Sequence, residues 1–153
     1  MRFFNTAGPV NCQDHYCIPP LTRFNLPEIL MLIKQKKYFV LHAPRQSGKT
    51  SCMLALRDYL NHEGRYQALY INVEIAQTAR NNVGRGIKAI LSQLAHVSEN
   101  LFSDPSPLEN RASIFEENGE DAALGVALSL LCRDSTSPLV LIIDEIDSLI
   151  GDV

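Results

Sequence analysis

The chain has 153 residues, a length that corresponds to one ordinary domain or to most of one. Hydrophobic residues make up 46% of the sequence and charged residues 20%, which is typical of globular proteins and argues against disorder as the main state. The net charge is −3 and no block of basic residues stands out, so neither a nucleic-acid-coating surface nor a nucleic-acid partner is indicated.

No segment has the length and composition expected of a membrane span. The longest mostly apolar run, 122–132, has 11 residues and contains Gly125, whereas a transmembrane helix needs about 20 residues. The sequence also turns polar directly after its first few residues and shows no apolar signal region. We therefore expect a cytoplasmic protein without a membrane partner.

The four cysteines are expected to be free thiols, because disulfides are rare in the cytoplasm. They are Cys12, Cys17, Cys52 and Cys132. The close spacing of Cys12, His15 and Cys17 offers zinc ligation as an alternative. A structural zinc site needs four ligands, however, and no second pair follows at finger-like spacing.

The first part of the chain is expected to contain an irregular arm, a helix and a strand. Residues 1–24 are rich in proline and aromatic residues and are assigned to an N-terminal arm, with residues 25–153 forming the N-terminal part of a folded domain. Asn25 is expected to cap a helix over 27–36, since Glu28 follows it at capping-box spacing. The short apolar run 38–42 predicts a buried strand.

The remaining elements alternate between helix and strand. Helices are expected over 50–61, over 83–94, where apolar residues recur at helical spacing, and over 121–133, and residues 98–113 are expected to form a loop. Strands are expected over 68–74 and 139–143. This order indicates an α/β domain with a parallel sheet covered on both faces.

The loop 43–50, with the sequence APRQSGKT, is the most informative segment. It matches the phosphate-binding pattern G-x-x-x-x-G-K-[ST], except that Ala43 replaces the first glycine. A strand before it and a helix after it are the context that this pattern requires, which disfavours a chance match. The predicted nucleotide-binding residues are Pro44, Arg45, Gln46, Ser47, Gly48, Lys49, Thr50 and Ser51.

The chemistry of phosphate binding explains these residue types. Backbone N–H groups of residues 47–50 can line a concave nest for phosphate oxygens. Gly48 lets the backbone approach the phosphates where a side chain would clash. Lys49 would place its ammonium group against the β- and γ-phosphates, and Thr50 would offer its hydroxyl to Mg²⁺.

An acidic pair, Asp144 and Glu145, follows the apolar strand expected over 139–143. Ligands of parallel α/β sheets gather at the carboxyl ends of the strands, so we expect this pair and the loop 43–50 to converge on one crevice. Asp144 would hold Mg²⁺ through its water shell, and Glu145 would orient the attacking water. The alternative is that the pair caps a helix beginning near Ile146.

These motifs resemble the AAA+/STAND-like branch of P-loop ATPases, and more specifically a bacterial AAA-like ATP-binding family. The resemblance is carried by residues 4–9, 15–18, 42–50 and 144–149. That family commonly has the loop H-A-P-R-Q-x-G-K-T, so Ala43 fits its pattern. The resemblance implies a three-layer α/β/α P-loop fold, ATP and Mg²⁺ as cofactors, and an adenine pocket lined by residues 16–20 and Arg23. The alternative for these residues is a solvated arm that packs on the sheet.

The resemblance also implies that the domain is incomplete. In this branch a further strand lies between the two motif-bearing strands, and a sensor residue, an arginine finger and a helical lid follow the acidic pair. This chain ends at Val153, so we expect a fragment or truncated reading frame that lacks the C-terminal strands and the lid. We accordingly expect weak nucleotide binding and slow or absent hydrolysis. Binding of a protein partner or self-association would occur through the missing C-terminal region.

The expected function is therefore MgATP binding, with ATP hydrolysis in the full-length parent and Lys49 and Glu145 as catalytic residues. A nucleotide-dependent switch or scaffold that does not hydrolyse ATP is the alternative. Kinase-like transfer would need an acceptor pocket and a lid, for which the sequence offers no candidates. Glu74 is an alternative to Glu145 as the catalytic carboxylate, and otherwise has a surface or capping role. Arg45 could contact a phosphate, a neighbouring subunit or only solvent.

Overall fold

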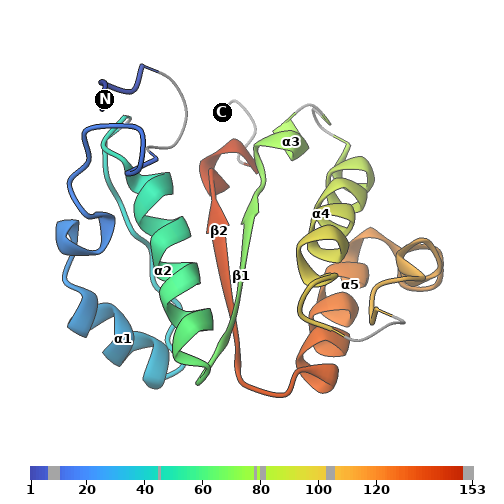
Figure 1. The fold of residues 1–153 in the computed structure, drawn as a ribbon. Coiled ribbons are helices and arrows are strands. Elements are labelled where there is room, and N and C mark those ends of the chain that lie inside the picture. The colour runs from blue at the N-terminus through green and yellow to red at the C-terminus, as the bar shows by residue number, and fades with distance from the viewer. Residues whose placement is uncertain (7–10, 45, 78, 80–81, 103–105, 150–153) are drawn as a thin grey trace. The chain divides into compact units, whose positions relative to one another are not determined.

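The computed structural model describes residues 1–6, 11–44, 46–77, 79, 82–102 and 106–149. These residues form an α/β protein with five α-helices, two 3₁₀ helices and a two-stranded parallel sheet (Figure 1). The chain divides into two compact units, Met1–Tyr59 and Leu60–Val153, and each is considered by itself. Arg45 lies outside the described residues, and its predicted role stays a prediction.

The first unit contains η1 (Pro20–Arg23), α1 (Leu26–Lys34) and most of α2 (Lys49–Glu63). Asn25 caps α1 as predicted, because its side chain accepts a hydrogen bond from the Glu28 backbone N–H at 3.4 Å and donates one to Glu28 Oε2 at 3.1 Å. The observed bounds of both α-helices lie within two residues of those predicted.

The strand predicted over 38–42 is absent, and residues 37–44 have neither helical nor strand structure. Tyr38 and Val40 are 105% and 82% exposed. A strand requires a second strand for its backbone hydrogen bonds, and among the described residues the ladder joins only 67–72 and 139–144. The prediction was wrong because apolar content indicates a preference for burial but does not supply a pairing strand.

The N-terminal arm is held by local contacts. Phe3 and His15 form an isolated bridge, with their rings edge-on at 4.7 Å. Cys12 and Cys17 form a disulfide with a Cα–Cα distance of 5.1 Å, so the prediction of four free thiols was wrong for this pair. A turn over residues 11–15, in which the His15 backbone N–H donates a hydrogen bond to the Asn11 carbonyl at 2.8 Å, contains Cys12 and brings it near Cys17. The disulfide also removes both sulfurs from the alternative zinc site.

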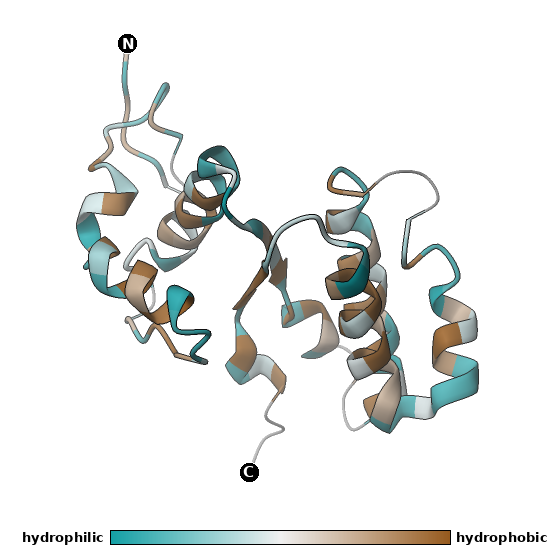
Figure 2. Ribbon diagram, turned by 90° about the horizontal axis from the view of Figure 1, so that it is seen from below, coloured by the Kyte–Doolittle hydropathy of each residue, from teal (hydrophilic) through white to brown (hydrophobic). Residues whose placement is uncertain are grey.

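The second unit is built on β1 (Gln67–Asn72) and β2 (Leu139–Asp144), which pair in parallel (Figure 1). α4 (Val83–Ser98) packs on β1, and α5 (Arg111–Asp134) packs on α4. Figure 2 shows hydrophobic residues along the strands and on one side of α4. The most deeply buried core residues of this unit include Leu69, Ile71, Leu91, Leu94, Leu108 and Leu131.

Two predictions for this unit need correction. β1 ends at Asn72, and Glu74 lies in α3 (Glu74–Gln77) rather than in the strand. α5 begins at residue 111, within the region predicted as a loop, and its helical geometry breaks at Gly119, where φ is 70° and ψ −179°. The sequence pattern did not predict this first segment of the helix, because residues 111–120 are rich in polar side chains. Among the described helices, none is both long and apolar enough to cross a bilayer.

Candidate functional site

The loop before α2 contains two residues in the left-handed region. Gln46 has φ 59° and Gly48 has φ 79°, and Ser47 lies between them. Alternation of left-handed and right-handed residues turns successive backbone N–H groups toward one side, which is the geometry of an anion-binding nest. Lys49 is the first residue of the 15-residue helix α2, whose N-terminus carries partial positive charge.

Ser47 adds a hydroxyl that lacks a partner among the described residues. Its Oγ atom is buried and makes no hydrogen bond. Leaving a buried polar group unsatisfied costs about 1–3 kcal/mol. A phosphate oxygen held by the loop would accept a hydrogen bond from this hydroxyl. The Ser47 hydroxyl therefore fits phosphate, the ligand that the sequence pattern predicts. Lys49, Thr50 and Ser51, in the first turn of α2, are half-buried.

The 3₁₀ helix η1 lies against the first turn of α2. The Cys52 thiol donates a hydrogen bond to the Pro20 carbonyl at 3.3 Å. The Arg23 guanidinium covers Gly48, since a Cβ atom built on Gly48 would lie 3.3 Å from Arg23 Cζ and still closer to one of its nitrogens. Burial raises the pKa of the Cys52 thiol, and the charge of Arg23 partly offsets that increase. Arg23, which the family resemblance assigns to the adenine pocket, thus contacts the glycine of the loop.

The carboxylate of Asp144 is buried at the end of β2, with 1% of the residue exposed. The Tyr70 hydroxyl donates a hydrogen bond to Asp144 Oδ2 at 3.0 Å, and the Glu145 backbone N–H donates one to Oδ1, also at 3.0 Å. The strand register explains the first contact. Asn72 is opposite Asp144, so Tyr70 lies two residues away on the same face of the sheet.

Glu145 has a left-handed backbone, with φ 58°. This conformation costs a residue with a side chain about 1–2 kcal/mol, and such strain concentrates at functional sites. The Glu145 carbonyl accepts a hydrogen bond from the Ser148 backbone N–H at 3.0 Å, in the turn that starts η2 (Ile146–Leu149). A short helix therefore follows the acidic pair, as the capping alternative predicts. The catalytic role of the pair and its capping role both stay predictions.

Glu74, the predicted alternative to Glu145, is exposed in the first turn of α3. Its backbone N–H bonds the Asn72 side chain at 2.9 Å, and α3 contacts η2. The carboxyl ends of the two strands thus gather Asn72, Glu74, Asp144 and Glu145 at one edge of the sheet. The loop 43–50 belongs to the first unit and the acidic pair to the second, so their convergence on one crevice stays a prediction.

The donor chemistry at Asp144 fits Mg²⁺. This ion takes oxygen ligands, keeps several waters, and is usually bound through one or two carboxylates together with substrate phosphates. Within the described ranges there is no cluster of three or more His, Cys, Asp or Glu residues that could hold a metal. The predicted Mg²⁺ ligands, Thr50 and Asp144, would therefore act together with water and nucleotide oxygens rather than as a protein cage.

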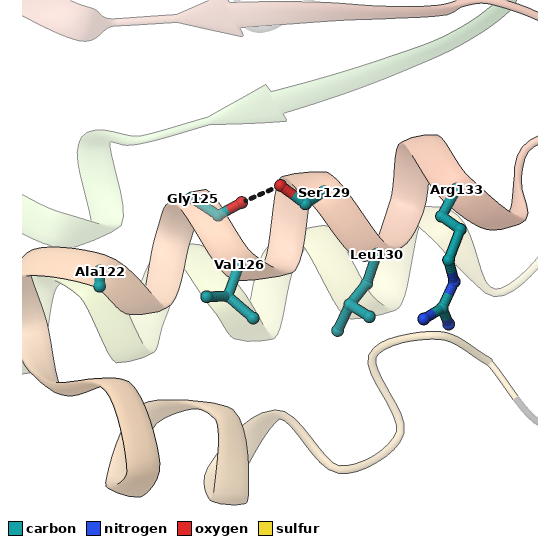
Figure 3. Close-up of a pocket in the computed structure, with 6 residues that line it drawn as sticks. All are labelled: Ala122, Gly125, Val126, Ser129, Leu130 and Arg133. Carbon is teal, nitrogen blue, oxygen red and sulfur yellow. Dashed lines mark hydrogen bonds between the residues drawn. The ribbon is translucent and has the colours of Figure 1, made fainter.

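A separate pocket of about 470 Å³ lies on the surface of α5 (Figure 3). Its lining is mostly apolar, and the Ser129 hydroxyl is engaged by the Gly125 carbonyl at 2.9 Å. The lining residues are Ala122, Gly125, Val126, Ser129, Leu130 and Arg133. None of them belongs to the residues predicted for nucleotide or metal binding.

Comparison with known proteins identifies a family for most of the chain. The family model described as "Nephrocystin 3, N-terminal" matches residues 26–150, and the chain belongs to that family. The matched range includes both the loop 43–50 and the acidic pair. No curated protein and no solved structure matched the chain.

Proposed function

We propose that this chain, as a member of the Nephrocystin 3, N-terminal family, binds MgATP through the loop 43–50 and the acidic pair. The observation that carries the proposal is the geometry of the loop. A glycine with φ 79° directly precedes a lysine at the N-terminus of a long helix, beside a buried serine hydroxyl that has no hydrogen-bond partner among the described residues. Each feature supports phosphate as the ligand. The choice of ATP over other nucleotides rests on the resemblance to AAA-like P-loop ATPases.

Each residue has a defined part in the proposed reaction, which is phosphoryl transfer from ATP to water. The loop N–H groups and Lys49 stabilise the phosphate charge. Glu145 accepts the proton of the water whose oxygen bonds to the γ-phosphorus, while the bond from that phosphorus to the bridging oxygen breaks. Mg²⁺, when held by Thr50 and Asp144, would neutralise charge that develops on the phosphate oxygens.

A second candidate function is a switch that holds ATP without hydrolysing it. The segment 38–42 favours this candidate, since it precedes the loop and makes no strand. Catalysis requires that the reacting groups be held within a fraction of an ångström, which a loop anchored on an unpaired segment does not provide. Binding tolerates more displacement than catalysis does. This chain would then bind nucleotide and turn it over slowly or not at all.

Thermal unfolding with and without MgATP tests the proposal. A ligand that binds only the folded state adds about 2.7 kcal/mol to the stability at a hundredfold excess over its dissociation constant. We expect this gain in the wild type and its loss in Lys49→Ala. Lys37→Ala is the matched control, because it removes the same charge from an exposed position in the same unit. Cooperative unfolding that MgATP does not shift in the wild type would overturn the proposed function.

A further inference from the structure

The Tyr70 hydroxyl occupies a position next to the proposed Mg²⁺ carboxylate. We infer that Tyr70 is a positioning residue, which orients the carboxylate of Asp144 toward the hydrated Mg²⁺ of the bound nucleotide. The inference rests on the proposed function, and it names a residue that neither the loop pattern nor the acidic-pair pattern contains. Tyr70 acts through Asp144 rather than by contact with the nucleotide.

The geometry supports an orienting role. Tyr70 is half-buried on β1, and Asp144 is almost fully buried on β2, two positions further along the same face. Hydrogen bonds engage both carboxylate oxygens of Asp144, Oδ2 from the Tyr70 hydroxyl and Oδ1 from the Glu145 backbone N–H. Bonds to both oxygens restrict rotation about the Asp144 side chain. We therefore expect the plane of the carboxylate to be restrained before any ligand binds.

Orientation matters because Mg²⁺ demands near-ideal octahedral geometry at its oxygen ligands and their waters. The orientation of a carboxylate decides which of its lone pairs can accept a hydrogen bond from a water of the ion. Residues that hold a metal ligand in place typically contribute 10–100-fold to metal affinity. We expect the same order of effect from a hydroxyl that holds Asp144.

Tyr70→Phe is the direct test, because it removes one oxygen and keeps the ring. The experiment measures binding of a fluorescent ATP analogue to the full chain, first in EDTA and then during a Mg²⁺ titration. We expect Tyr70→Phe to bind the analogue in EDTA as the wild type does, but to need about tenfold more Mg²⁺ for half-maximal enhancement of binding. Tyr66→Phe, a half-buried tyrosine that precedes β1, is the matched control and should titrate like the wild type.

A double-mutant cycle separates the positioning role from a general packing role. Asp144→Asn should weaken the Mg²⁺ enhancement, and adding Tyr70→Phe to it should have little further effect if both residues act through one carboxylate. Additive losses would instead mean that Tyr70 acts independently of Asp144, which would overturn the inference.

The remaining outcomes distinguish the inference from the proposed function. If the wild type binds the analogue and responds to Mg²⁺, while Tyr70→Phe gives the same titration, the inference fails and the proposed function stands. If Tyr70→Phe loses binding equally in EDTA and in Mg²⁺, Tyr70 has only a structural role and the inference also fails. If the wild type binds no analogue under either condition, the proposed function fails and the inference fails with it.

Discussion

The Arg23 guanidinium lies directly over Gly48, the left-handed residue that precedes Lys49 at the start of α2. Two independent constraints therefore act on one residue. The positive φ disfavours any side chain at position 48, and Arg23 occupies the space that the first side-chain carbon would take. This contact joins η1 to the loop that is proposed to hold phosphate.

Gly48→Ala should destabilise the first unit and abolish the stabilisation by MgATP. The left-handed backbone alone costs about 1–2 kcal/mol for a residue with a side chain, and the contact with Arg23 adds to that cost. The nest of N–H groups depends on the same backbone conformation, so nucleotide binding should be lost together with stability. Thermal unfolding with and without MgATP measures both effects. Retained MgATP stabilisation in Gly48→Ala would contradict the proposed role of the loop.

Two other glycines supply controls for this variant. Gly64 has φ 73° and no described atom within 4 Å of a Cβ built on it, so Gly64→Ala isolates the backbone cost. Gly125 also has open space but lies in α5 without a positive φ, so Gly125→Ala should be neutral or stabilising, by up to about 1 kcal/mol. If Gly48→Ala lowers the stability more than Gly64→Ala does, the excess reports the collision with Arg23. In Arg23→Ala that excess should disappear.

The Cys52 thiol gives a pH-dependent measure of the same contact. Burial raises the pKa of Cys52 and the charge of Arg23 lowers it, so Arg23→Ala should raise the pKa of this thiol further. At a fixed pH slightly above 8, less thiolate is present and alkylation of Cys52 should be slower than in the wild type. Peptide mass spectrometry across a pH series measures this rate, with the exposed Cys132 as internal reference. Unchanged Cys52 rates would mean that Arg23 does not lie beside the thiol in solution.

The raised pKa of Cys52 also predicts the direction in which the stability of the first unit changes with pH. A neutral thiol is favoured in the folded state, so this contribution is fully present below the pKa of the unfolded thiol and is lost as the pH rises through the folded value. We therefore expect the first unit to lose stability on the alkaline side of the ordinary thiol pKa. Cys52→Ala should remove that dependence.

Local sequence patterns predicted the helices better than the strands. The cap at Asn25 and the helical spacing in α4 depend on neighbours three or four residues apart, which the sequence contains. The segment 38–42 has strand-like composition, but its state depends on a pairing strand that local sequence does not specify. The Cys12–Cys17 disulfide was not predicted, because an expected cytoplasmic location favours free thiols, whereas the turn over residues 11–15 brings the two cysteines together.

The motif predicts the local geometry of the loop, whereas the contact between Tyr70 and Asp144 arises from the fold and was not predicted. The positive φ of Gly48 and the position of Lys49 at a helix start agree with the loop pattern. Tyr70 is 74 residues from Asp144 in the sequence and meets it only through the strand register. A register predicted with Asn72 opposite Asp144 would have found this contact, because residues two apart share a face.

The disulfide of the arm predicts a definite thiol count. Under denaturing, non-reducing conditions an excess of maleimide should add two labels, at Cys52 and Cys132, and four after reduction. Closing such a short loop restricts the unfolded chain and is worth about 2 kcal/mol in the chain-entropy account. Reduction should therefore loosen the arm, with little effect on the second unit, which hydrogen exchange of the two units can measure. Four labels without reductant would show that the disulfide does not form.

The left-handed backbone of Glu145 predicts opposite effects of two substitutions. Glu145→Gly relieves a strain of about 1–2 kcal/mol but gives up about 0.5–1 kcal/mol through the greater freedom of glycine in the unfolded chain, so a net stabilisation is expected. Glu145→Gln keeps the backbone strain and should leave stability unchanged. Both variants lack the carboxylate that is proposed to accept a proton from water. Both should therefore lose any ATP hydrolysis that the wild-type chain shows.

Urea unfolding of the two variants beside the wild type separates the backbone from the carboxylate. A higher midpoint for Glu145→Gly alone means that the strain is real and is retained at the proposed catalytic position. A lower midpoint for Glu145→Gly would mean that side-chain contacts of Glu145 outweigh the strain. Equal loss of stability in both variants would point to the capping alternative, in which the carboxylate stabilises the start of η2 and has no catalytic part.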